Sequence, residues 1–130
     1  MVLRAILIAI LFTVLPFGQV ATAEPPLPQV LITSVYLHMP SETLTINGQN
    51  FDGGPPVVTL GDDPVPLEVI STTATQIVVN CPLDLGDSSC KDGDFRLTVS
   101  TGPANKDSGA YDITIPSISD CILQDCNGPI

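Results

Sequence analysis

Four cysteines carry the most definite chemistry in this chain. Cys81 and Cys90 are nine positions apart, and Cys121 and Cys126 are five apart. In an exported protein, four cysteines are expected to form disulfides, with three intramolecular pairings to choose from. We expect the two local pairs, Cys81 with Cys90 and Cys121 with Cys126. The alternatives are a bridge from Cys81 to the tail, a tail pair that joins two chains, and a zinc site, which C-x8-C and C-x4-C spacing disfavours.

Carboxylates are the second group that could do chemistry, because 14 acidic residues stand against four Lys and Arg. Ca²⁺ takes six to eight oxygen ligands, and several acidic residues fall between predicted strands. Their spacing does not match a twelve-residue calcium loop, so a site would be assembled from several loops. The alternative is a solvated surface that keeps the protein soluble. The calcium candidates are Asp62, Asp63, Asp84, Asp87 and Asp92.

The chain has one histidine, His38, in a predicted turn beside Met39 and Pro40. A three-histidine metal site is therefore excluded, and a Ser-His-Asp triad would need this residue. Asp62 and Asp63 are neighbours in a turn and point apart, which disfavours paired acid-base catalysis. No G-x-S-x-G, phosphate-binding glycine loop or H-E-x-x-H motif occurs. We predict that the protein is not an enzyme and has neither a catalytic residue nor a cofactor.

The first 23 residues have the layout of a secretory signal peptide. Arg4 precedes an apolar run over residues 5–15, Pro16 and Gly18 break the run, and Ala21-Thr22-Ala23 forms a small-residue cleavage site. The alternative is an uncleaved anchor, since residues 2–20 approach the ~20 needed to cross a bilayer. We predict cleavage after Ala23 and a secreted protein, extracellular or at the cell surface, with the periplasm as the alternative.

Cleavage would leave 107 residues, a usual size for one domain. Three Lys or Arg would remain against 14 acidic residues, a net charge of −11. So acidic a surface repels phosphate backbones and anionic lipid. The composition therefore argues against nucleic-acid partners and against membrane insertion after cleavage.

The elements that must position these residues are strands. A proline-rich leader, residues 24–29, reads as extended chain. It precedes seven segments with β-branched residues or period-two alternation, and nothing in the mature chain reads as a helix. The predicted fold is an all-β, two-sheet sandwich over residues 30–116, followed by a cysteine-containing tail, residues 117–130. The predicted strands are residues 30–37, 43–47, 57–60, 65–70, 75–81, 94–101 and 110–115.

If successive strands run antiparallel, their loops sort to alternate ends of the sandwich. One end would collect the loops at 37–42, 61–64 and 82–93, which makes it the most acidic part of the molecule. The core contains no Trp, so it must rest on aliphatic packing. Its largest members are expected to be Phe51, Phe95 and Tyr111.

One stretch resembles a known family. Residues 44–51 read L-T-I-N-G-Q-N-F, with an expected turn at Asn47-Gly48 before a buried Phe51, and P-P-V-V-T-L-G follows over residues 55–61. These motifs, together with residues 71–79, 93–102 and 108–115, resemble IPT/TIG domains of the bacterial secreted type. The resemblance implies an immunoglobulin-like sandwich of the E-set type. It implies no shared active site.

The function expected from these features is that of a secreted, non-enzymatic binding or structural module. It would act in protein–protein interaction or in extracellular assembly or adhesion, with a protein partner or further copies of itself. The partner would meet the acidic end or an exposed sheet edge. The alternatives are a carbohydrate-binding or calcium-binding module of an extracellular system. The aromatic supply for sugar stacking is small, since Tyr36 and Tyr111 are the only tyrosines.

Overall fold

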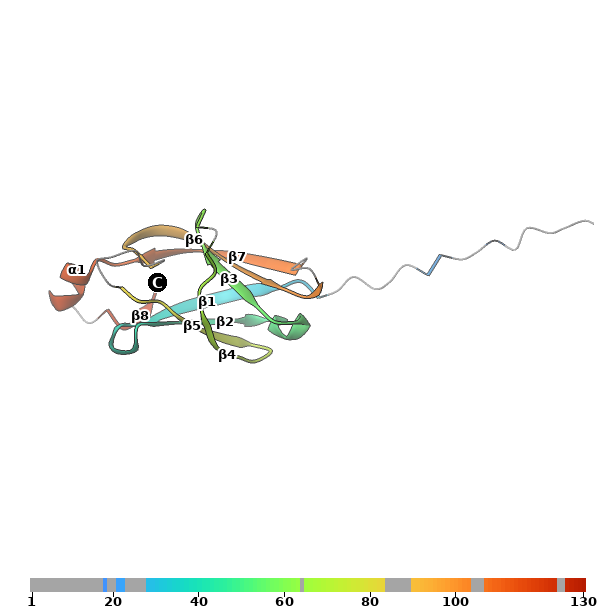
Figure 1. Ribbon diagram of the computed structural model, residues 1–130, viewed down its shortest axis with the longest axis horizontal. Coiled ribbons are helices and arrows are strands. Elements are labelled where there is room, and N and C mark those ends of the chain that lie inside the picture. The colour runs from blue at the N-terminus through green and yellow to red at the C-terminus, as the bar shows by residue number, and fades with distance from the viewer. Residues whose placement is uncertain are drawn as a thin grey trace, which may run out of the picture.

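The computed structural model describes residues 18, 21–22, 28–63, 65–83, 90–103, 107–123 and 126–130. It confirms the predicted all-β sandwich of two antiparallel sheets (Figure 1). Five strands form one sheet in the order β4-β5-β2-β1-β8, and three form the other in the order β3-β6-β7. The predicted cleavage site after Ala23 lies outside the described residues, as does most of the leader.

The five-stranded sheet is built around β1 and β2. Strand β1, Leu31–His38, pairs with β2, Thr43–Gln49, across a turn that holds the short 3-10 segment η1, Met39–Ser41. Strand β5, Gln76–Asn80, pairs with the other edge of β2, and β4, Val69–Thr72, completes that side. A two-residue strand near the chain end, β8 (Gly128–Pro129), pairs with β1.

The three-stranded sheet contains the longest pairing in the molecule. Strands β6, Gly93–Thr101, and β7, Asp107–Ile115, pair antiparallel along all nine residues of each. Strand β3, Val57–Leu60, pairs with the second half of β6. The first sheet contacts the second most closely where β1 lies against β7.

Alternation along these strands places one apolar row on the inside of each sheet. Phe51, in the 3-10 turn η2 (Phe51–Gly53), is buried as predicted. Phe95 and Tyr111 are only half-buried and pack against the edge of the core. Most of the apolar volume is aliphatic, as a core without Trp requires. The other large side chains that are essentially fully buried are Val35, Leu37, Leu44, Ile46, Val58, Leu60, Ile77, Val79, Leu97, Val99 and Ile115.

The expected turn at Asn47-Gly48 was wrong. Strand β2 continues through Gly48, which pairs with Ile32, and the chain turns at Asn50, whose φ is 65°. Gly48 is needed for space: a Cβ there would collide with the carbonyl oxygen of Leu31 and the ring of Phe51. The glycine thus lets the buried Phe51 ring lie against the strand backbone.

The tail and the segment before β4 also differ from prediction. A six-residue helix, α1 (Ile118–Leu123), follows β7 although no helix was expected. The expected strand over residues 65–70 is reduced to a single bridge between Leu67 and Val58, and β4 begins only at Val69. Proline interrupts this segment at residues 64 and 66, which removes N–H donors that a ladder would need.

Candidate binding surfaces

The loops that were expected to form one acidic end do not all lie there. His38, Thr43 and Asn80 are cross-strand partners, and Gly93 pairs with Ile115, so these strand ends meet at the end that carries α1 (Figure 1). The turn after β3 lies elsewhere, because Leu60 pairs with Leu97 in the middle of β6. Strand β3 is too short to reach the end of the sandwich, so Asp62 and Asp63 project partway along its side.

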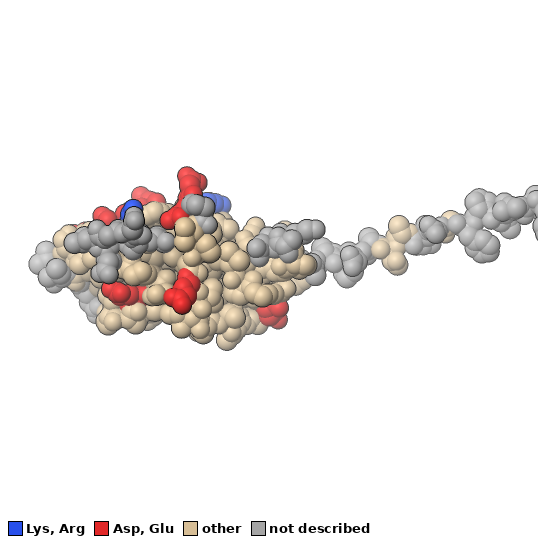
Figure 2. Space-filling model, viewed as in Figure 1, with Lys and Arg blue, Asp and Glu red and all other residues tan. Residues whose placement is uncertain are grey.

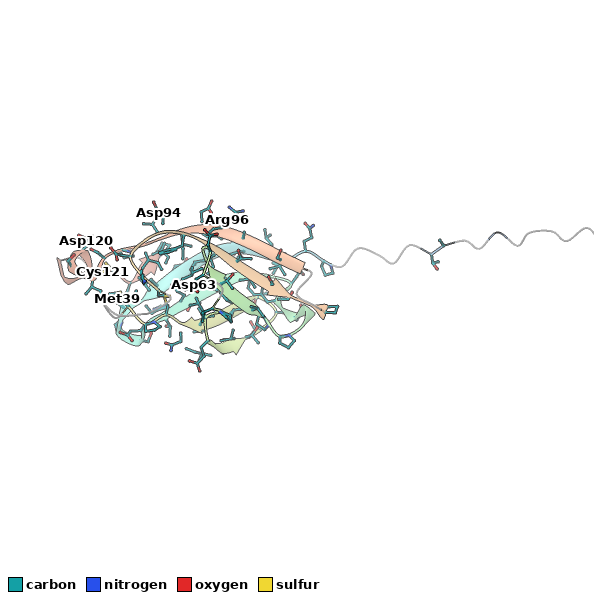
Figure 3. All side chains as sticks on the ribbon, turned by 45° about the horizontal axis from the view of Figure 1, so that its top comes forward. Met39, Asp63, Asp94, Arg96, Asp120 and Cys121 are labelled. Atoms are coloured by element: carbon teal, nitrogen blue, oxygen red, sulfur yellow. A yellow bond between two sulfur atoms is a disulfide. The ribbon has the colours of Figure 1, made fainter. Side chains whose placement is uncertain are left out.

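Asp62 and Asp63 join a different group of charges. They line a shallow hollow with Lys91, Asp94 and the ring of Phe95. Figure 3 shows Asp63, Asp94 and Arg96 along the side of the molecule, away from Met39, Asp120 and Cys121 at its end. We call the outward surface of β6 and β7 with this turn the charged side; it consists of Asp62, Asp63, Lys91, Asp94, Arg96 and Asp112.

Cross-strand pairs organise the charged side. Arg96 Nη1 lies 3.1 Å from Asp112 Oδ1, and the hydroxyl of Thr114 donates to Asp94 Oδ1 at 2.7 Å. The side chains of Arg96 and Asp112 are 65% and 79% exposed, so water screens this pair strongly. Asp63 Oδ1 accepts from the Val65 N–H at 2.9 Å and so fixes its own turn. The surface is therefore preformed but solvated, which suits recognition of a charged partner.

The calcium candidates do not converge in the part of the chain that is described. Asp62 and Asp63 share their hollow with Lys91, whose positive charge disfavours a bound cation. Asp92 is exposed, and Asp84 and Asp87 lie outside the described residues. No group of three or more His, Cys, Asp or Glu side chains that could hold a metal occurs among the described residues.

His38 lies at the end of β1, exposed, and pairs across the ladder with Thr43. Its backbone carbonyl accepts from the Ser41 hydroxyl at 3.4 Å, a contact that belongs to the turn. Within the described chain, every buried side-chain nitrogen or oxygen has a hydrogen-bond partner. Nothing described around His38 positions it against a nucleophile.

Two disulfides brace the end that carries α1. Cys81 and Cys90 are bonded, with a Cα–Cα distance of 5.4 Å, and both are buried. This bridge ties the end of β5 to the segment that leads into β6, and so links the two sheets. The Cys81 N–H also donates to the Glu42 carbonyl at 2.7 Å. The second bond, Cys121 to Cys126, closes a small ring at the end of α1, with a Cα–Cα distance of 5.1 Å.

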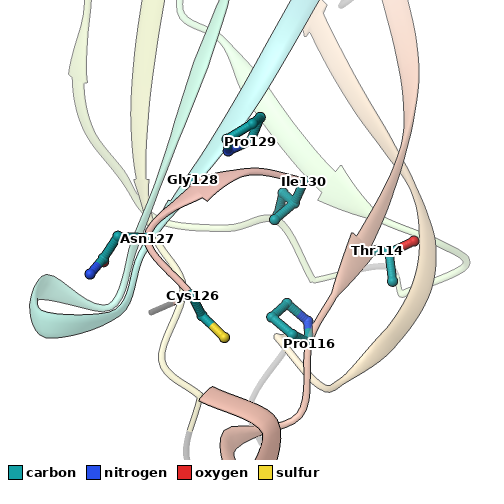
Figure 4. Close-up of a pocket in the computed structure, with 7 residues that line it drawn as sticks. All are labelled: Thr114, Pro116, Cys126, Asn127, Gly128, Pro129 and Ile130. Carbon is teal, nitrogen blue, oxygen red and sulfur yellow. The ribbon is translucent and has the colours of Figure 1, made fainter. Parts of the chain in front are cut away.

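Beyond that ring the chain returns to the sandwich. The Ile130 N–H donates to the Val35 carbonyl at 3.0 Å, and the Met39 N–H donates to Asn127 Oδ1 at 3.1 Å. Figure 4 shows the open space between this returning segment and β7, bounded by Thr114, Pro116 and Ile130. No strand is predicted here from the sequence, because Gly128-Pro129 has low β propensity. The segment covers part of the β1 edge that would otherwise be open.

The outward surface of the five-stranded sheet was not singled out by the sequence. Its five strands contain no Asp, Glu, Lys or Arg. In register across them lie Pro129, Tyr36, Thr45, Val78 and Ser71. A neighbouring row is hydrogen-bonded: Asn47 Nδ2 donates to Ser34 Oγ at 3.3 Å, and Gln76 Nε2 donates to Asn47 Oδ1 at 3.0 Å. We call this surface the neutral face.

The order and pairing of these strands match an immunoglobulin-like domain, and one comparison decides the family. The model of the IPT/TIG domain matches residues 31–115, from the start of β1 to the end of β7. The chain belongs to the IPT/TIG family. No curated protein and no solved structure matches it significantly.

IPT/TIG domains are immunoglobulin-like, non-enzymatic modules that generally take part in protein–protein interaction. The match ends at Ile115, so α1, the tail disulfide and β8 lie outside it. Among the described residues, no helix has the length and hydropathy needed to span a bilayer.

Proposed function

We propose that this IPT/TIG protein is a secreted, non-enzymatic binding module that meets a protein partner through its charged side. The observation that carries the proposal is the uneven distribution of charge. Both described cations, Lys91 and Arg96, lie on the charged side among its aspartates, whereas the strands of the opposite sheet have no charge. Such a pattern of both signs on a rigid sheet can select a partner by complementary charges.

The form of the sandwich supports this role. Strands β6 and β7 hold the backbone of Asp94, Arg96 and Asp112 in a nine-residue ladder, so little backbone entropy is lost when a partner binds. In Figure 2 acidic atoms gather along the upper edge of the view, over this sheet and the turn after β3. Isolated acidic residues elsewhere, such as Glu42, Asp52 and Glu68, are spread over separate loops.

Two further observations support the proposed location and the proposed lack of catalysis. Both disulfides favour an oxidising compartment, in keeping with the expected signal peptide. The one histidine is exposed at a strand end, and the described residues that line the hollow beside Asp62 include no Ser, Thr, Tyr or Cys that could act as a nucleophile. Extracellular adhesion or assembly would follow from binding of this kind.

The test begins with gentle purification of the secreted protein at low salt and identification of what accompanies it by native mass spectrometry. Binding of that partner is then measured for the wild type and for the triple variant D62N/D63N/D94N. The control variant, E42Q/D52N/E68Q, removes the same number of charges from other exposed loops. We expect the first variant to weaken binding more than about tenfold and the control less than about threefold.

Equal effects of the two triple variants would show that only net charge matters and would refute the charged side as the binding surface. A robust hydrolytic activity that is lost when His38 is replaced by Ala would refute the non-enzymatic role. Partner binding that requires Ca²⁺ and is abolished by a chelator would instead assign the acidic loops to a metal site.

A further inference from the structure

We propose that the neutral face joins two copies of this chain, sheet against sheet, in a two-fold dimer. The face is the outward surface of β4, β5, β2, β1 and β8. Its centre is Thr45, which lies between Tyr36 on β1 and Val78 on β5. Every position in the central row is uncharged. The carboxylate nearest to the face is that of Glu68 at its margin, where Oε2 accepts from Asn80 Nδ2 at 3.4 Å.

Charge is the reason for choosing a second copy as the occupant. The full chain carries a net charge of −10, so two copies repel each other. The charged side, the turns after β1 and β3, and the start of α1 all carry carboxylates, at Asp94, Glu42, Asp62 and Asp120 among others. Contact through any of these would bring an excess of negative charge together, because even the charged side has four aspartates against Lys91 and Arg96. The neutral face is the large described surface whose centre carries no charge, and Glu68 lies at its margin, so two copies can meet there with the least repulsion.

The chemistry of the face is also complementary to itself. Amide side chains both donate and accept hydrogen bonds, so Asn47, Gln76 and Asn80 of one copy can pair with the same residues of another. Hydroxyls of Thr45 and Ser71 can do likewise, while Tyr36 and Val78 offer apolar contact. Tyr36 is 37% exposed although its neighbours on both sides along β1, Val35 and Leu37, are fully buried. A two-fold axis that passes near Thr45 would bring these groups together in pairs.

The size of the face sets the expected strength. Five strands about 4.8 Å apart and roughly five residues long give a surface of about 20 Å by 15 Å. That is below the ~800 Å² per partner of a standard stable interface. The dimer should therefore be weak, with a dissociation constant of about 0.1–1 mM, and should form where the protein is concentrated or held on a surface.

This inference deepens the proposed binding function, because it names a second copy as one partner, but it uses the opposite side of the sandwich. The proposed binding of a charged partner and the proposed dimer can therefore be refuted independently. Binding of a charged partner should weaken as salt rises, whereas self-association should strengthen, because salt screens the repulsion between two acidic bodies. A protein that binds its partner as a monomer would keep the proposed function and lose this inference.

Sedimentation equilibrium of the purified, disulfide-intact protein up to about 1 mM tests the proposal. The variant T45E places a charge at the centre of the neutral face, and T98E is its matched control. Thr98 is also half-buried, outward and central in its sheet, between Thr59 and Ala110. We expect T45E to weaken the dimer more than about tenfold and T98E less than about threefold.

A mixture of T45E with T45K should restore dimers, because opposite charges then meet across the axis. If T45E loses the wild-type circular dichroism spectrum, Y36K replaces it at a more exposed position. Three results would overturn the proposal: a monomer at every concentration, equal weakening by T98E, or failure of the mixed variants to associate. Retention on a neutral polysaccharide column, lost in T45E while the protein stays monomeric, would assign the face to carbohydrate instead.

Discussion

Breaking the Cys81–Cys90 bridge should destabilise the whole sandwich, whereas breaking the Cys121–Cys126 bridge should not. The first bridge joins β5 to the segment before β6, and both sulfur atoms are buried. The second closes a ring outside the core, attached to the sandwich mainly through the two residues of β8 and through Ile130. The tail can therefore detach while the rest of the domain stays folded.

The magnitude follows from loop closure. A bridge between residues nine positions apart lowers the entropy of the unfolded chain by about 8.6 cal/mol/K. At 25 °C this loss stabilises the folded state by about 2.6 kcal/mol. The variant C121A/C126A isolates this term, because reducing it breaks only the Cys81–Cys90 bond and leaves both sulfur atoms in the core. For a domain of about 100 residues, the same loss lowers the melting temperature by about 10–20 °C.

Urea denaturation at 25 °C provides the assay. We expect the free energy of unfolding of C121A/C126A to lie within about 1 kcal/mol of the wild type, and to fall by about 2–3 kcal/mol on reduction. A loss below about 1 kcal/mol on reduction would refute the role given to the buried bridge. A loss from C121A/C126A itself as large as that from reduction would show that the tail folds as part of the core.

Three other predictions follow. G48A should lower the free energy of unfolding by about 2–3 kcal/mol in urea denaturation, because the added Cβ has no space against the Leu31 carbonyl. In the control G128A the added Cβ meets nothing within 4 Å, so the free energy of unfolding should change by less than about 0.5 kcal/mol. Equal effects of the two variants would contradict the packing around Gly48. R96A should change the free energy of unfolding by less than about 0.5 kcal/mol in the same measurement, since water screens its exposed pair with Asp112, and a larger loss would indicate a structural role. Added Ca²⁺ or a chelator should shift the melting temperature by less than about 1 °C in scanning calorimetry, and a rise of several degrees with Ca²⁺ would reveal a metal site.

The sandwich could be predicted from the sequence because its signals are local. Apolar residues occupy every second position at Phe95, Leu97 and Val99, and the structure places these side chains on the inside of β6. The motif that ends in the buried Phe51 likewise indicates the family, because all of its residues lie within one short segment of the sequence. The alternation along each strand therefore predicts which aliphatic side chains are buried, even when the pairing of the strands is unknown.

Other features depend on contacts that the sequence does not display. The Asn47-Gly48 pair predicts a turn, because Asn-Gly favours turns, yet packing against Phe51 requires Gly48 inside a strand. Strand β8 has no propensity of its own and exists because the edge of β1 is available. Asp62 and Asp63 are predicted at the acidic end, although residues 57–60 are correctly predicted as a strand, because the sequence does not display the register that pairs Leu60 with Leu97 in the middle of β6.

The neutral face shows the same limit in another way. Its residues come from five segments, and none of these segments is unusual alone. Only the registers that place Tyr36, Thr45 and Val78 side by side reveal an uncharged surface on a strongly acidic protein.

The most direct test of a two-sided binding module is the salt dependence of both equilibria in one analytical ultracentrifugation series. The purified protein is studied alone and with its co-purified partner as NaCl rises from about 20 mM to about 500 mM. We predict that the partner complex weakens over this range while the dimer strengthens. If both equilibria respond to salt in the same direction, or neither responds, the division into a charged side and a neutral face is contradicted.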